Sequence, residues 1–133
     1  MAKNILIIDD DRSLSRVLIK ALKNSNTDIE SVGTLSEAWV EIDKNDYDVI
    51  ITDVMLPDGD GLELVQKLTK KKLNLKIIVI SAKNNLLTAV KASELGVFEY
   101  LPKPIDLNDL TIVVNRALQS QTNKKNKSNS ISE

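Results

Sequence analysis

Short apolar runs alternate along the chain with longer segments in which hydrophobic residues recur every three or four positions. Short runs of this kind are typical of buried strands, and the spaced pattern is typical of amphipathic helices. The predicted strands are residues 5–8, 27–32, 47–52, 77–80 and 98–101, and the predicted helices are residues 13–24, 34–42, 62–68, 87–95 and 107–118. Five such alternations predict an α/β fold with a parallel sheet, because crossover helices would bury both faces of its strands.

Polar residues at the ends of the predicted helices agree with these boundaries. Thr34 is followed three positions later by Glu37, the pattern of a capping box. Asp11 stands where it can cap the helix that begins near Ser13. Gly96 follows the helix that ends near Leu95 and suits the left-handed position after a helix.

The 133 residues fit a single domain. Residues 1–121 carry the alternating pattern and are predicted to form that domain. From Gln119 to Glu133 the sequence turns to Gln, Asn, Lys and Ser with one Ile, so burial in residues 122–133 cannot offset the entropy of ordering. We therefore expect a polar flexible tail or the start of a linker.

Composition removes several classes of function. The chain has no Cys and no His, which excludes disulfides, thiol nucleophiles, Ser-His-Asp triads and ordinary structural zinc sites. Its net charge of −1 provides no general basic field for nucleic acid or an anionic membrane. No stretch reads as a signal peptide or membrane span, so a cytoplasmic location is expected.

Groups that bind phosphate or hard cations stand at four predicted strand ends. Asp9 and Asp10 follow the first strand, Asp53 the third, Ser81 the fourth, and the fifth runs into Lys103. Ligands of open parallel sheets bind beyond the carboxyl ends of the strands. Each residue alone has a simpler explanation as a cap, turn or surface residue, but four independent strand ends would then have to match one site by accident.

Several carboxylates in one pocket need compensation, because two unit charges about 5 Å apart repel by roughly 3 kcal/mol at an effective dielectric of about 20. Mg²⁺ would remove this repulsion and prefers oxygen ligands. We assign Asp10 and Asp53 as direct ligands, with Asp9 bound directly or through water, and the backbone carbonyl of Met55 as a further ligand.

The same groups would support phosphorylation of Asp53. Charge on the transferring oxygens must be stabilised in the transition state. Mg²⁺ would bridge the nucleophile and a phosphoryl oxygen, Lys103 would supply a mobile positive charge, and Ser81 could donate a hydrogen bond. Lys103 lies between Pro102 and Pro104, and the sequence leaves open whether the Lys103–Pro104 bond is cis.

Taken together, five motifs resemble the receiver family of two-component response regulators. They are Ile7-Ile8-Asp9-Asp10, Thr52-Asp53-Val54-Met55-Leu56-Pro57, Gly59-Asp60-Gly61, Ser81-Ala82 and Leu101-Pro102-Lys103-Pro104. The resemblance spans roughly residues 3–121. It implies a flavodoxin-like (CheY-like) doubly wound sheet of five parallel strands in the order 2-1-3-4-5, with five helices. It also implies that Asp53 takes its phosphoryl group from a phosphohistidine of a sensor histidine kinase.

The resemblance further implies a switch rather than an enzyme, catalysing at most its own phosphorylation and dephosphorylation. Ser81 and Tyr100 match the switch pair, which would remodel the face of the fourth helix, fifth strand and fifth helix, a possible homodimer surface. Residues 98–106 look most like receivers of NtrC-type transcriptional activators. Those proteins add an ATPase and a DNA-binding domain, which we expect to be absent here, so the chain is part of a longer regulator or a stand-alone receiver. The motif and polar tail favour the first.

Three other functions account for fewer of these residues. Phosphatases of the haloacid-dehalogenase type also use a strand-terminal Asp with Mg²⁺, but place a second acid two residues later, where this chain has Met55. A nucleotide-binding domain would need a Gly-rich loop after the first strand, which is missing. A receiver that cannot be phosphorylated is disfavoured by the intact set of acids.

Overall fold

A computed structural model describes the backbone of residues 2–71, 74–82 and 86–131, and side chains as far as residue 120. Its central feature is a parallel sheet of five strands: β1 (Lys3–Ile8), β2 (Thr27–Val32), β3 (Val49–Asp53), β6 (Lys76–Ser81) and β7 (Glu99–Pro102). The strands lie side by side in the order β2-β1-β3-β6-β7. Counted along the chain, these five strands have the expected order 2-1-3-4-5.

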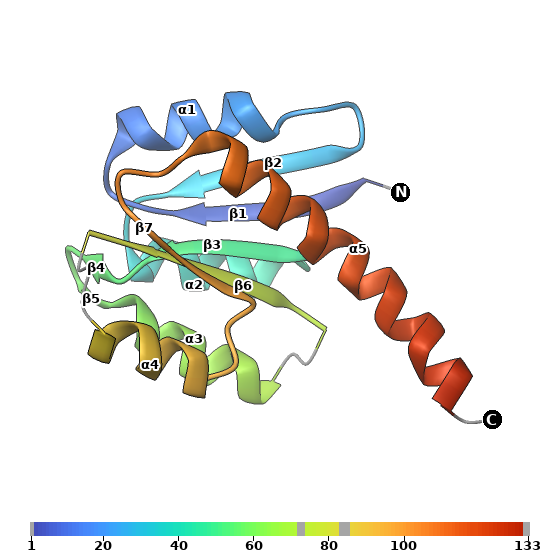
Figure 1. Ribbon diagram of the computed structural model, residues 1–133. Coiled ribbons are helices and arrows are strands. Elements are labelled where there is room, and N and C mark those ends of the chain that lie inside the picture. Colours follow the sequence, from blue (N-terminus) through green and yellow to red (C-terminus); the bar gives the residue numbers. More distant parts are fainter. Residues whose placement is uncertain (1, 72–73, 83–85, 132–133) are drawn as a thin grey trace.

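Five helices within the described residues cover the two faces of this sheet (Figure 1). They are α1 (Arg12–Leu22), α2 (Leu35–Lys44), α3 (Gly61–Lys71), α4 (Leu86–Glu94) and α5 (Leu107–Ile131). Alternate strand residues face opposite sides. Ile5 and Ile7 pack in one core with residues of α1 and α5, whereas Leu6 and Ile8 pack in the other with residues of α2, α3 and α4. The predicted doubly wound arrangement is confirmed.

The helix ends follow the predicted capping. Asp11 is the N-cap of α1 and accepts from the backbone N–H of Leu14. Thr34 is the N-cap of α2 and accepts from the N–H of Glu37. After α4, Gly96 has a φ of +86°, the left-handed conformation expected there.

Two features differ from the prediction. The turn-rich segment after β3 contains a short antiparallel pair, β4 (Met55–Leu56) and β5 (Gly59–Asp60), where the sequence indicated only a loop. The last helix continues to Ile131, whereas its apolar stripe ends at Leu118. A local stripe marks only the part of a helix that packs against a core, so helix beyond that stripe leaves no such signal. Whether residues 122–133 form a linker stays a prediction.

No helix in the described part of the chain combines the length and apolar composition needed to cross a membrane.

Candidate functional site

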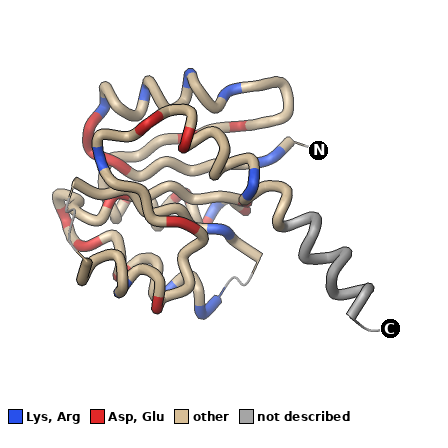
Figure 2. Tube along the Cα trace, viewed as in Figure 1, with Lys and Arg blue, Asp and Glu red and all other residues tan. Residues whose placement is uncertain are grey.

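The sheet brings the predicted acids together at the carboxyl ends of β1 and β3. Asp9 follows β1 directly and Asp53 is the last residue of β3, and the two strands are paired in register. Figure 2 shows acidic positions gathered where β1 leads into α1. One carboxylate oxygen from each of Asp9, Asp10 and Asp53 lies within 4.8 Å of the others. Acids 43 residues apart in the chain thus form one cluster, as the strand pattern predicts.

The three acids differ in exposure. Asp9 is 2% exposed and Asp53 is 6% exposed, whereas Asp10 faces solvent. Asp9 Oδ1 accepts a hydrogen bond of 2.9 Å from the backbone N–H of Asp11, which links the acid to the N-cap of α1. The site is therefore buried at Asp9 and Asp53 and open to solvent at Asp10.

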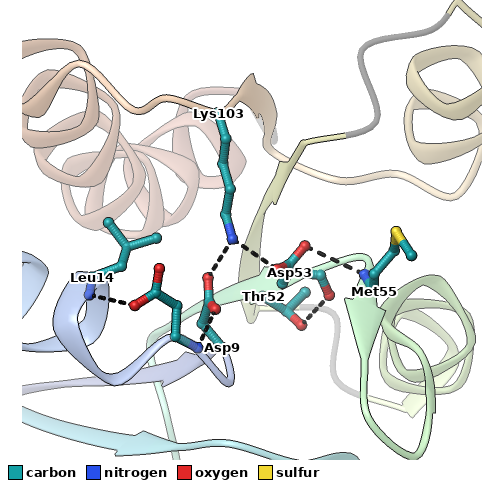
Figure 3. A network of polar contacts seen from close by, with 7 residues as sticks. Asp9, Leu14, Thr52, Asp53, Met55 and Lys103 are labelled. Carbon is teal, nitrogen blue, oxygen red and sulfur yellow. Dashed lines mark hydrogen bonds and ion pairs between the residues drawn. The ribbon is translucent and has the colours of Figure 1, made fainter.

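Lys103 lies between the two buried carboxylates (Figure 3). Its Nζ is 2.8 Å from Asp53 Oδ2 and 3.0 Å from Asp9 Oδ2. The first contact is both a hydrogen bond and an ion pair, and the second is an ion pair. Lys103 follows β7, so a cation from one strand end pairs with acids from two others. The Lys103–Pro104 bond is cis, which the sequence left open.

Burial affects the pKa values of both Asp9 and Lys103. Burial raises the pKa of Asp9 above its ordinary value, although the Asp11 N–H and Lys103 oppose the shift. Burial alone would lower the pKa of Lys103, but its hydrogen bond to Asp53 and its ion pairs with Asp53 and Asp9 outweigh that effect and raise it. The lysine is therefore held in its charged form.

The donor set fits a hard divalent cation. Three carboxylates offer oxygen atoms, and Asp9 Oδ2 is a buried oxygen that accepts no hydrogen bond within the part of the chain described. Asp10, Asp53 and Asp9 could hold such an ion. Met55 lies beside them, since its backbone N–H donates to Asp53 Oδ1 over 3.3 Å, and its carbonyl stays a predicted further ligand.

The two predicted switch residues lie on neighbouring strands. Ser81 ends β6 and is fully buried, and its carbonyl oxygen accepts from the Lys103 N–H at 2.9 Å. Tyr100 is half-buried on β7, paired in register with Val79 of β6. Both strands run towards the acid cluster, but the structure describes a single arrangement, so their switching role stays a prediction.

Sequence reasoning missed one residue that shapes the site. A Cβ added to Gly61 would lie 2.0 Å from the Asp53 carbonyl oxygen, so only glycine allows this approach. The Gly61 N–H also donates to the Val54 carbonyl over 2.7 Å. The Gly-Asp-Gly turn was a signal for special backbone geometry there, but not for contact with Asp53.

Comparison with known proteins shows the family to which the chain belongs. The family model described as "Response regulator receiver domain" matches residues 5–115. The chain belongs to the response regulator receiver family. The resemblance drawn from the motifs is therefore confirmed at the level of the family, while the role of each site residue is still a prediction.

Relatives of this receiver domain point to the NtrC type. The chain is 48% identical to the DNA-binding transcriptional regulator NtrC of Azospirillum brasilense over 121 residues, covering 91% of this chain and 25% of that protein. It is 34% identical to the response regulator protein PilR of Pseudomonas aeruginosa over 114 residues, covering 86% of this chain and 26% of that protein. This receiver domain spans about a quarter of the length of these relatives.

Solved receiver structures share the fold. A CheY-like receiver domain protein from Methanospirillum hungatei has a TM-score of 0.87 at 27% identity, covering 93% of this chain and 99% of that one. The beryllofluoride-activated NtrC4 receiver domain dimer has a TM-score of 0.83 at 29% identity, covering 89% and 98%. The expected CheY-like fold is thus confirmed.

Proposed function

We propose that this receiver domain accepts a phosphoryl group on Asp53 from a phosphohistidine of a sensor histidine kinase, with Mg²⁺ bound by the neighbouring acids. The observation that carries the proposal is the convergence of Asp9, Asp10, Asp53 and Lys103 from three strand ends. Acids alone could form a solvated cap. A buried acid pair with a lysine between them, beside an exposed third acid, suits a site that takes a metal and an anion together.

Each residue has a distinct task in this reaction. An Asp53 carboxylate oxygen forms a bond to phosphorus while the bond from phosphorus to the donor breaks, leaving an acyl phosphate. Lys103 pairs with Asp53 before the reaction and is close enough to follow the new negative charge afterwards. Ser81 would offer its hydroxyl to another phosphoryl oxygen. Mg²⁺, when bound, supplies the positive charge that offsets the repulsion between the acids and the incoming anion.

The phosphatase alternative remains disfavoured. It requires a proton-transferring acid two residues after the nucleophile, and that position holds Met55, whose side chain is 57% exposed and carries no ionisable group. The domain would then act as a phosphorylated switch, and catalyse at most its own phosphorylation and dephosphorylation.

A mass measurement tests the assignment of Asp53. The protein is incubated with Mg²⁺ and acetyl phosphate, and the intact mass is followed. Wild type should gain one phosphoryl group, Asp53→Asn should gain none, and Asp43→Asn, which changes an exposed acid of α2, should behave like wild type. Equal gains by wild type and Asp53→Asn, or no gain by wild type under conditions that modify other receivers, would refute the proposal.

We further propose that phosphorylation, through Ser81 and Tyr100, remodels the face formed by α4, β7 and α5, and that this face then forms a homodimer that controls a transcriptional output. The support is apolar exposure along α4: Leu87 is 82% exposed, Leu86 80% and Val90 44%. Such a row of apolar side chains on one helix is typical of an interaction surface. The relative NtrC4 receiver is described as a dimer in its beryllofluoride-activated form.

Light scattering tests the dimer. Wild type should gain mass when acetyl phosphate and Mg²⁺ are added, and Leu87→Glu should stay monomeric while still accepting the phosphoryl group. Val40→Glu changes an apolar residue of α2 that is 52% exposed and should dimerise normally. Dimers that survive Leu87→Glu would place the interface elsewhere.

A further inference from the structure

Asp58, in the turn between β4 and β5, is joined to the first turn of α2 by three hydrogen bonds. Its Oδ1 accepts from the backbone N–H of Leu35 at 2.8 Å. Its Oδ2 accepts from the N–H of Ser36 at 3.0 Å and from Ser36 Oγ at 2.9 Å. Residues 22 and 23 positions apart in the chain are therefore linked through one exposed carboxylate.

These bonds use helix donors that the N-cap leaves free. The first N–H groups of a helix have no partner within the helix. Thr34 satisfies the Glu37 N–H, and Asp58 satisfies those of Leu35 and Ser36. The hydrogen bonds from Leu35 and Ser36 lower the pKa of Asp58, so the carboxylate is ionised and also complements the positive end of α2.

The residues just before α2 lie against the loop that carries Asp9 and Asp10. The Asp9 N–H donates to the Val32 carbonyl over 3.0 Å. A Cβ on Gly33 would be 3.7 Å from the Asp10 Cα, so these backbones are in ordinary contact. The segment that leads into α2 thus touches the Asp9–Asp10 loop, and the first turn of α2 binds the Asp58 turn.

The Asp58 turn is connected to the site by a very short stretch of chain. Met55 begins β4, two residues after Asp53, and pairs with Asp60 of β5 across the turn. A second contact also seats the turn on α2, because a Cβ on Gly59 would lie 2.7 Å from Leu35 Cδ1. The Met55 backbone is therefore linked to the start of α2 through this turn.

We infer that Asp58 is a positioning residue for the metal site. By anchoring the β4–β5 turn to the start of α2, it holds the Met55 backbone at a fixed position relative to the Asp9–Asp10 loop. This inference rests on the proposed function, since it concerns the Mg²⁺ site beside Asp53. The three hydrogen bonds would then do more than cap α2. A residue outside the β4–β5 turn could cap the helix equally well, but only a residue of the turn can anchor the turn to it.

Mg²⁺ affinity separates positioning from simple capping. Asp58→Ala should weaken Mg²⁺ binding about tenfold, the lower end of the effect seen when residues supporting metal ligands are removed. Thr34→Ala removes a capping bond from the same end of the same helix but leaves the Asp58 anchor, so its Mg²⁺ affinity should stay within about twofold of wild type. Binding is measured by calorimetry, with thermal unfolding of the metal-free proteins alongside to compare stability.

Amide chemical shifts give a second readout. Asp58→Ala should shift the Met55 and Leu56 amides in metal-free protein, and Thr34→Ala should not. Ser36→Ala removes only one of the three bonds and provides a milder form of the test if Asp58→Ala does not fold. Equal weakening of Mg²⁺ binding by Asp58→Ala and Thr34→Ala, or none by either, would overturn the inference alone. Wild type that binds no Mg²⁺ would overturn the proposed function and this inference with it.

Discussion

Replacing Gly61 by alanine should distort the backbone that carries Asp53. The added Cβ would lie 2.0 Å from the Asp53 carbonyl oxygen and 3.1 Å from Thr52 Oγ1, where ordinary contacts begin at 3.4 Å. The two backbones would have to separate by 1.4 Å, the difference between 3.4 and 2.0 Å. Neither backbone segment can move easily. Asp53 is paired with Ile80 in the sheet, and the Gly61 N–H donates a hydrogen bond to the Val54 carbonyl.

The expected loss of stability is about 3 kcal/mol. Overpacking at a site that cannot relax costs roughly 1–3 kcal/mol. Loss of the Gly61–Val54 hydrogen bond adds about 1 kcal/mol. Urea unfolding followed by the fluorescence of Trp39 should show a midpoint lower by about 1–2 M, given the usual dependence on urea for small domains. Phosphorylation of Asp53 should fall too, because its backbone has moved.

Gly96→Ala is the matched control. Gly96 also has a positive φ, +86°, but a Cβ there meets nothing within 4 Å. Its cost should be limited to the left-handed backbone, about 1 kcal/mol. If Gly61→Ala were no more destabilising than Gly96→Ala, the close approach to Asp53 would not matter and the reasoning would be refuted.

Two predictions concern charge in the site. Burial raises the pKa of Asp9 above its ordinary value of 3.8, so as pH rises the unfolded chain loses this proton before the folded chain does. The free energy of unfolding of the metal-free protein therefore falls as the pH rises from the ordinary pKa to the raised pKa. Asp9→Asn should remove that loss and raise the urea midpoint at pH 7 without Mg²⁺; a lower midpoint would contradict the sign. Lys103→Met should tighten Mg²⁺ binding about tenfold, because a hydrogen bond from the ammonium to Asp53, worth about 1.5 kcal/mol, no longer competes with the metal. Lys103→Arg keeps the charge and should bind Mg²⁺ like wild type in the same calorimetric titration, whereas weaker binding by Lys103→Met would disprove the competition.

Local patterns were enough to predict the strands, the capped helix ends and the edge of the sheet where the acids meet. Each depends on residues close in sequence: apolar runs, a Thr34–Glu37 box, a Gly after a helix. The convergence of Asp9, Asp53 and Lys103 follows from strand direction alone, because the carboxyl ends of parallel strands share one edge. The family resemblance added the strand order, which periodicity cannot supply.

The same patterns could not predict the β4–β5 pair or the end of α5. Met55–Leu56 and Gly59–Asp60 are too short to show the alternation that marks a strand. The segment 119–131 lacks an apolar stripe, so nothing in its sequence indicated that the helix continues.

By itself, the amino-acid sequence determined which residues form the sheet and which chemical groups stand at the carboxyl ends of its strands, because periodicity and strand direction are local properties of the chain. Tertiary structure alone decided how those groups are arranged: that Lys103 lies between Asp9 and Asp53, and that Asp58 reaches α2. These contacts join residues from about 20 to more than 90 positions apart. They depend on how loops pack against one another after the strands have paired, and no local pattern records that packing.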